Sequence, residues 1–273
     1  MWCVAFGVVF FGIGCGPFAL ESTGTPAIPS ALIGEEGAVL SDVVETPVLA
    51  RESLSGGIEH ISYSFSTSSR ARLELYGFPQ ESYAFRLAAD NAGKSMAAWR
   101  DGAPQNVVAG INAMYFLEDL SPAGFFVADG VAQRAHPFDW NLSALLTVDE
   151  DGTLDIRATT EEPEDSADLT HAAQSYPLLV LNGSPLLETD SGKTSRRSFV
   201  GTDTDGYVWI GVLTDGEASL YQLGQLMNTL EIPWEQVLNL DGGASSGLFV
   251  REGDDVTHPS YTSVPSVLFV ETR

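Results

Sequence analysis

One segment of the chain combines a carboxylate, adjacent glycines and adjacent serines. NLDGGASSG follows the apolar run WEQVL. Asp241, at the end of a short buried strand, would hold a carboxylate at the edge of a cleft, and Gly242 and Gly243 would let backbone N–H groups approach a ligand. Ser245 and Ser246 add short hydroxyls. A plain turn, in which the aspartate bonds its own backbone, explains the same letters, so the segment alone leaves both interpretations open.

A second segment concentrates positive charge. GKTSRRSFVG contains Lys193, Arg196 and Arg197, three of the 13 Lys and Arg residues of the chain. A guanidinium group presents a planar fork of N–H donors that matches phosphate or carboxylate oxygens. The segment therefore predicts an anion-binding site, with the alternative that these cations pair with surface acids.

The rest of the chain is acidic, with 37 Asp and Glu residues and a formal net charge of −24. Such a surface repels nucleic acid and anionic membrane faces at long range, so we expect no nucleic-acid partner. The four histidines lack zinc-ligand spacing, and G-x-S-x-G and a complete P-loop motif are absent. We expect no cofactor and no metal site built on histidine; a calcium site in the acidic segment 149–168 is an alternative, although its spacing fits no EF-hand.

The N-terminal segment MWCVAFGVVFFGIGCGPFAL carries no charged residue. Its apolar core has the length of a signal-peptide core and is short for a membrane span. GIGC resembles a lipobox, which makes Cys15 a candidate for lipidation and membrane anchoring. Residues 1–20 are therefore predicted to be a signal or lipoprotein signal segment, with a retained helix as the alternative. The protein is expected to be exported and to be extracellular, periplasmic or a membrane-anchored lipoprotein.

Two further regions follow. Residues 21–57 mix Pro, Gly, Ser and acids without a sustained period, which predicts a flexible linker; the alternative is that AVLSDVVETPVLA adds a strand to the domain edge. Residues 58–273 are expected to form one domain. Its short apolar segments, separated by Asp-Gly and Asn-Gly, predict three hairpins, in SALLTVDEDGTLDIRA, LLVLNGSPLLE and RSFVGTDTDGYVWIGVLTDG.

Two helices interrupt the strand pattern. A short one is expected in residues 91–100, closed by Asp-Gly. A longer one is expected in residues 219–231, where leucines and a methionine form one apolar stripe and Ser219 with Gln222 forms a capping box. The pattern predicts an α+β fold with an extensive, largely antiparallel sheet and a few flanking helices.

In this order, the segments resemble the phosphodiester glycosidase family, which includes N-acetylglucosamine-1-phosphodiester α-N-acetylglucosaminidases and many exported bacterial proteins. The resemblance covers roughly residues 106–270 and rests on AGINAMYF, AGFFVADG, YPLLVLNGSPL, RRSFVGTDTDGYVWIGVLTDG, LYQLGQLMNTL and NLDGGASSGL. Ala244 stands where the family usually has a third glycine, and Met114 and Tyr115 also depart from its usual pattern. The family's fold is α+β with a largely antiparallel sheet.

The resemblance implies hydrolysis of sugar-1-phosphodiesters at the glycosidic C–O bond, with GlcNAc-1-phosphodiesters of envelope or extracellular glycans as candidate substrates. Arg197 would hold the phosphate, Asp241 would act as base or nucleophile, and Asp215 would supply a second carboxylate. The substrate-binding candidates are Asn112, Arg196, Gly242, Gly243, Ser245 and Ser246. The expected partner is thus a glycan or a sugar phosphate.

Two other functions stay open at this point. One is a non-catalytic carbohydrate-binding or envelope-associated module that keeps the cleft without turnover. The other is a glycosidase of phosphate-free α-linked sugars.

Overall fold

The computed structural model describes residues 47–66, 70–132, 142–159 and 169–273. The predicted signal segment and most of the predicted linker lie outside these ranges. Within the described part, no helix has the length and apolar character needed to cross a membrane.

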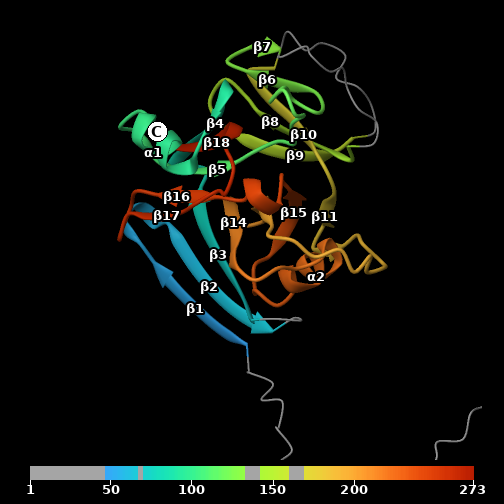
Figure 1. Ribbon diagram of the computed structural model, residues 1–273. Helices are drawn as coiled ribbons and strands as arrows, with labels where there is room; N and C mark the ends of the chain where they lie inside the picture. The colour runs from blue at the N-terminus through green and yellow to red at the C-terminus, as the bar shows by residue number, and fades with distance from the viewer. Residues whose placement is uncertain (1–46, 67–69, 133–141, 160–168) are drawn as a thin grey trace, which may run out of the picture. The chain divides into compact units, whose positions relative to one another are not determined.

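Three antiparallel sheets form the described part of the chain (Figure 1). The largest has eight strands in the order β1 (Val48–Ser53), β2 (Glu59–Ser66), β3 (Arg70–Pro79), β14 (Tyr207–Asp215), β13 (Ser198–Asp203), β15 (Trp234–Asn239), β11 (Leu178–Leu181) and β12 (Ser184–Pro185). A second has the order β17 (Val256–His258), β16 (Leu248–Val250), β5 (Val107–Asn112), β18 (Val264–Thr272) and β4 (Tyr83–Lys94). The third has the order β7 (Val131–Ala132), β6 (Phe126–Ala128), β10 (His171–Ser175), β8 (Ala144–Val148) and β9 (Leu154–Ala158).

The α-helices of the described part are α1 (Met96–Gly102) and α2 (Leu220–Met227), and short 3-10 turns occur at Ser55–Gly57 and Gly243–Ser245. The predicted capping box of α2 is present, because Ser219 and Gln222 each bond the other's backbone N–H. Helix α1 begins later than expected, because β4 continues to Lys94 and Ser95 is the residue that caps the helix. The sheets and the two helices confirm the predicted α+β fold.

The three predicted hairpins are present as β8–β9, β11–β12 and β13–β14. Their turns contain glycines at positive φ, which are Gly152 (82°), Gly183 (74°) and Gly206 (84°). A side chain at such a φ is strained, so the Asp-Gly and Asn-Gly pairs of the sequence specify where each strand turns back.

The eight-stranded sheet buries apolar side chains on both faces. On one face, Val200 of β13 and Leu238 of β15 belong to a core that includes Ile111 of β5. On the other, Phe199 and Val237, their chain neighbours, pack with residues of α2. Successive side chains of a strand point to opposite faces, so each strand serves both cores. This double burial holds β13 and β15 rigidly side by side.

The start of the domain differs from the predicted boundary. Val48–Ser53, within the predicted linker, form β1 and pair along their whole length with β2. All six β1 residues are exposed, and β1 lies at the edge of its sheet. The exposure of both faces explains why this segment shows no hydrophobic alternation in the sequence. It agrees in part with the alternative that the region adds an edge strand.

Candidate active site

Asp241 lies two residues beyond the end of β15, where the chain crosses between two sheets. The N–H of Leu240 donates to the carbonyl of Ser198 (2.9 Å), and the N–H of Asp241 donates to the carbonyl of Ala113 (3.1 Å). The carbonyl of Ser198 belongs to the eight-stranded sheet, and the carbonyl of Ala113 belongs to the chain that follows β5. Asp241 is therefore held at a junction of the two sheets.

The Asp241 carboxylate is partly buried and has only neutral hydrogen-bond donors. Oδ1 accepts from the N–H of Gly242 (2.9 Å), and the side chain also bonds Ser245. Burial raises the pKa of Asp241 to about 6, because the charged form loses hydration, while the bonds from Ser245 and Gly242 act in the lowering direction. A carboxylate with such a pKa can exchange a proton near neutral pH.

Asn112, the last residue of β5, is buried, and both polar atoms of its side chain form hydrogen bonds. Its Nδ2 donates to the carbonyl of Asp241 (2.7 Å), and its Oδ1 accepts from the hydroxyl of Ser198 (2.7 Å) and the N–H of Gly247 (3.0 Å). The side chain thus joins β5, β13 and both ends of the glycine-serine loop. The structure places Asn112 beneath the site, where it orients Asp241 through the backbone.

Arg197 lies on the α2 side of this junction. Its Nε donates to the carbonyl of Ala218 (2.9 Å), and Nη2 donates to the carbonyl of Lys193 (3.0 Å). An ideal Cβ on Gly242 would stand 3.7 Å from Nη1, so the guanidinium borders the glycine next to Asp241. Burial lowers the pKa of Arg197, and charge interactions with Tyr115 and Glu217 oppose that shift. The arginine keeps its charge, and Nη1 is directed toward the loop.

The Arg196 side chain makes other contacts, beside residues 259–262, of which residues 261 and 262 donate their backbone N–H groups to the carbonyl of Ala244 in the glycine-serine loop. Its Nε donates to the carbonyl of Leu213 (3.3 Å), Nη2 donates to the carbonyl of Pro259 (3.3 Å), and the guanidinium lies 4.3 Å from the ring centre of Tyr261. Adjacent side chains of an extended segment leave on opposite sides. The two arginines, predicted as neighbours in one anion site, are therefore separated by the local backbone.

Tyr115 lies within electrostatic range of both Asp241 and Arg197. Its hydroxyl donates to the carbonyl of Tyr176 (2.8 Å) and accepts from Nδ2 of Asn239 (2.7 Å). Burial raises the pKa of Tyr115 to about 12; the Asp241 carboxylate also raises it, and the Arg197 guanidinium lowers it. Both charges therefore lie within electrostatic reach of one hydroxyl. Because its proton is committed to a carbonyl, the hydroxyl can only accept a further hydrogen bond.

The glycine-serine loop is built by backbone contacts. A Cβ on Gly242 would approach the carbonyl of Arg196 to 2.9 Å, and Gly243 has a φ of +66°. The N–H of Gly243 donates to the same carbonyl (2.9 Å). Ser245 bonds Asp241, whereas the buried hydroxyl of Ser246 has no hydrogen-bond partner within the described residues. The structure thus brings Ser245 to the carboxylate and leaves Ser246 behind the loop.

Asp215 lies apart from Asp241. It ends β14, pairs in register with Arg72 after an irregularity in the strand, and lines a separate hollow of about 260 Å³ with Ser64, Arg70 and Arg72. Within the described residues, no hydrogen bond or charge interaction joins it to Asp241. The predicted role of Asp215 as a second carboxylate therefore gains no support from this placement. The register shift between Leu213 and Asp215 is a feature that sequence spacing does not reveal.

Sequence reasoning missed three members of this junction. Asn239 and Tyr115 sit inside the quoted segments NLDGG and AGINAMYF, but nothing in their spacing indicated that they meet. Glu217 accepts from the hydroxyl of Thr194 (2.9 Å) and acts electrostatically on Arg197. Within the described part of the chain, no group of three or more acidic, His or Cys side chains is arranged to hold a metal ion.

Solved structures of similar fold include two proteins with 15% sequence identity to the chain. One is a hypothetical protein from Synechocystis, with a TM-score of 0.57 over 84% of this chain and 64% of that one. The other is the catalytic domain of zebrafish N-acetylglucosamine-1-phosphodiester alpha-N-acetylglucosaminidase, auto-inhibited by its pro-peptide, with a TM-score of 0.53 over 84% of this chain and 83% of that one. The chain thus spans under two thirds of the Synechocystis protein. A comparison with curated proteins found no match.

These likenesses place the chain in a class of α+β proteins built on large antiparallel sheets. The family model of the phosphodiester glycosidases matches residues 105–271, which contain Tyr115, Arg197 and Asp241. The chain belongs to the phosphodiester glycosidase family, a family of glycoside-cleaving hydrolases.

Proposed function

We propose that this protein hydrolyses sugar-1-phosphodiesters at the glycosidic C–O bond and releases a free sugar and a phosphate monoester. The observation that carries the proposal is that the Asp241 carboxylate and the Arg197 guanidinium both border Gly242: its N–H donates to Oδ1 of Asp241 (2.9 Å), and an ideal Cβ on it would stand 3.7 Å from Nη1 of Arg197. Arg197 binds the phosphate oxygens, and Asp241 faces the anomeric carbon of the sugar. The remaining loop contacts hold these two groups in place.

The chemistry needs only one carboxylate. When the C1–O bond breaks, its electron pair stays on the phosphate oxygen, and the second pKa of a phosphate monoester is about 6. The leaving group therefore departs without strong protonation, unlike a sugar alkoxide. The positive charge of Arg197 stabilises the developing phosphate charge in a partly buried site, where such an interaction is stronger than in water.

Asp241 acts in its ionised form, as the base that takes a proton from the attacking water or as the nucleophile that bonds to C1. In the first case the water oxygen bonds to C1 and its proton passes to Asp241. In the second, water cleaves the sugar ester in a later step. The oxocarbenium-like centre is common to both routes, and a nearby carboxylate stabilises it.

The choice of substrate draws support from the zebrafish protein, whose name specifies N-acetylglucosamine-1-phosphodiesters. We infer that such linkages in envelope or extracellular glycans are the substrate of this chain. The predicted signal segment supports export, and Cys15 would provide a lipid anchor. Labelling with a radioactive fatty acid, compared between the wild type and Cys15→Ala, tests the anchor; equal labelling of the two contradicts it.

A hydrolysis assay tests the proposed reaction. The substrate is the methyl phosphodiester of α-GlcNAc-1-phosphate, and both free GlcNAc and methyl phosphate are measured. Asp241→Asn and Arg197→Ala are each expected to lower kcat/KM by at least about a hundredfold, in line with the loss of a group that stabilises transition-state charge.

Matched controls are Asp205→Asn in the exposed β13–β14 turn and Arg157→Ala, which removes an exposed ion pair with Asp155. Both are expected to leave the rate unchanged. Equal rates in wild type, Asp241→Asn and Arg197→Ala would reject the assignment. Binding of the substrate without product in the wild type would instead indicate a non-catalytic carbohydrate-binding module. If an aryl α-GlcNAc is hydrolysed as fast as the phosphodiester, the enzyme does not depend on the phosphate, and the protein is a glycosidase of phosphate-free sugars.

A further inference from the structure

A second hollow lies at the far end of β15 from Asp241. It has a volume of about 460 Å³, within the range of small-molecule pockets, and is lined by the β11–β12 turn, the β13–β14 turn, the end of α2 and the start of β15. Trp234 begins β15 and Asp241 follows its end, so the two lie roughly 20 Å apart along the strand. The hollow is therefore separate from the proposed catalytic site.

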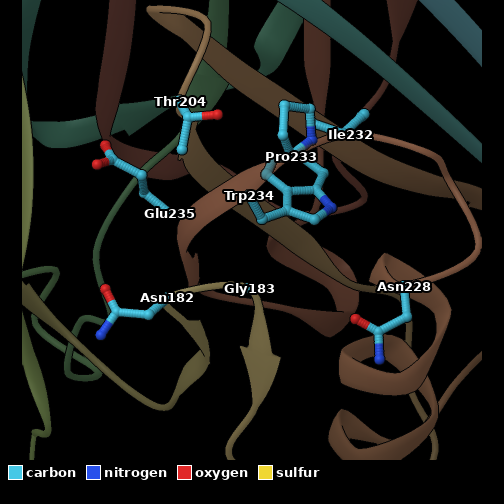
Figure 2. Close-up of a pocket in the computed structure, with 8 residues that line it drawn as sticks. All are labelled: Asn182, Gly183, Thr204, Asn228, Ile232, Pro233, Trp234 and Glu235. Atoms are coloured by element: carbon cyan, nitrogen blue, oxygen red, sulfur yellow. The ribbon is translucent and has the colours of Figure 1, made fainter.

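Four polar side chains surround this hollow, namely Asn182, Thr204, Asn228 and Glu235. Figure 2 shows Asn182, Thr204 and Glu235 on one side of the view and Asn228 on the other, with Trp234 between them. All four residues are exposed, and the structure assigns their side chains no hydrogen-bond partner within the described ranges. Two amides, a hydroxyl and a carboxylate are thus available to a ligand.

The walls of the hollow are held in place by backbone and buried contacts. The N–H of Asn182 donates to the carbonyl of Glu235 (2.6 Å), and the N–H of Thr204 donates to the carbonyl of Pro233 (3.0 Å). The indole N–H of Trp234 donates to the carbonyl of Met227 (3.1 Å) at the end of α2. The three segments are therefore fixed before a ligand arrives, which reduces the entropy cost of binding.

The lining decides the class of ligand. No Lys or Arg lines the hollow. A phosphate or sulfate would therefore be repelled by the carboxylate of Glu235 and by the negative net charge of the protein. Pro233 and Ile232 supply apolar wall, and the amides and carboxylate can each form paired hydrogen bonds. A neutral sugar combines apolar C–H faces with hydroxyls that both donate and accept. That chemistry matches this lining.

We propose that this hollow is an accessory binding site for a neutral saccharide. Both this site and the proposed catalytic site adjoin α2: Arg197 bonds the carbonyl just before its N-cap, and Asn228 is its C-cap. An eight-residue helix is about 12 Å long, so an extended glycan can reach both ends. The site would hold part of the glycan that carries the phosphodiester, although binding itself does not depend on hydrolysis.

Direct binding tests the proposal. The catalytically impaired Asp241→Asn protein is applied to an array of neutral oligosaccharides of glucose, galactose, mannose and N-acetylglucosamine, and hits are quantified by calorimetry. At least one neutral oligosaccharide is expected to bind. Asn228→Ala and Glu235→Gln are each expected to weaken that binding about fivefold or more, the effect of losing one hydrogen bond.

The matched control is Gln225→Ala, which removes an exposed amide from the same helix outside the hollow. It is expected to leave binding unchanged, and Asn228→Trp, which fills the hollow, is expected to abolish it. Thermal unfolding checks that each variant is folded. The proposal is overturned if no neutral oligosaccharide binds, or if Asn228→Trp binds as tightly as its parent. Because the assay uses an impaired enzyme, failure of the proposed hydrolysis would not affect its outcome.

Discussion

The side chain of Asn112 donates a 2.7 Å hydrogen bond to the backbone carbonyl of Asp241, 129 residues later in the chain. Asn112 ends β5, in the five-stranded sheet that also contains β18 and β4. Asp241 follows β15, a strand of the eight-stranded sheet. With its bonds to Ser198 and Gly247, this one amide fixes where the two sheets meet. The proposed reactive carboxylate is thus positioned by a residue that does not need to touch the substrate.

We expect Asn112→Ala to destabilise the fold and lower activity together. The substitution leaves the buried hydroxyl of Ser198 and the N–H of Gly247 without an acceptor, at a cost of about 2–4 kcal/mol in the free energy of unfolding. Urea denaturation measures the loss. Ser198→Ala removes one hydrogen bond and leaves every backbone group with its partner. It is expected to lower the free energy of unfolding by about 1 kcal/mol. Equal stability of Asn112→Ala and wild type would contradict the role assigned to the amide.

The raised pKa of Asp241 predicts how activity depends on pH. If the carboxylate form reacts, kcat/KM rises with pH and levels off above the pKa of about 6. A pH profile of kcat/KM between about pH 4.5 and pH 8 measures this limb. A profile that is already flat at the acidic end would show that the reactive group titrates lower.

The same pKa predicts how stability depends on pH. The folded value of about 6 lies above the ordinary value of 3.8, so between these values the folded protein holds a proton that the unfolded chain releases. The free energy of unfolding therefore falls as pH rises through this window. Asp241→Asn removes the buried charge and is expected to raise stability above pH 6 by about 2 kcal/mol. Parallel stability curves for the two proteins across the window would exclude this effect.

The adjacent arginines are expected to respond differently to substitution. Arg197→Lys keeps the charge but loses the fork geometry, so we expect kcat/KM to fall about tenfold or more, with a larger loss in Arg197→Ala. Arg196→Met keeps the buried volume and removes a guanidinium whose Nη1 lacks a partner within the described residues. Its effect on kcat/KM is expected to be under about threefold. A larger loss of kcat/KM in folded Arg196→Met than in Arg197→Lys would reverse the assignment.

Tyr115 offers a single-atom test of the junction. Tyr115→Phe removes the hydroxyl that accepts from Asn239 and donates to the carbonyl of Tyr176. We expect kcat/KM to fall about tenfold while the protein stays folded, because the ring remains and the carbonyl keeps its bond from Asn239. Steady-state kinetics with circular dichroism as the folding control measure this. An unchanged kcat/KM would show that the Tyr115 hydroxyl does not contribute to the activity of the site.

Substitutions of Asp215 and Glu217 test the roles of these two acidic residues separately. Asp215 lines a different hollow, so Asp215→Asn is expected to leave kcat/KM within about threefold of wild type. Glu217→Gln removes a charge that acts on Arg197, and we expect it to change KM more than kcat. A hundredfold loss in Asp215→Asn would restore the original expectation of a catalytic role for Asp215.

Much of the fold could be predicted because its signals are local. Glycine at positive φ specifies the hairpin turns, and the capping box specifies where α2 begins. The short helix was placed too early because the strand β4 runs on to Lys94 through residues without a clear alternation. The edge strand β1 was assigned to a linker because both of its faces are exposed.

By itself, the sequence determined the family, the mainly antiparallel α+β fold and the motif residues Asp241 and Arg197. Which of their neighbours share the site could be learned only from the folded chain. The tertiary structure gives the Arg196 and Arg197 side chains different partners, shows no contact between Asp215 and Asp241 within the described residues, and adds Tyr115 to the site. The physical reason is that strand alternation, register irregularities and the pairing of distant strands set side-chain direction, and these depend on contacts between residues far apart in the chain.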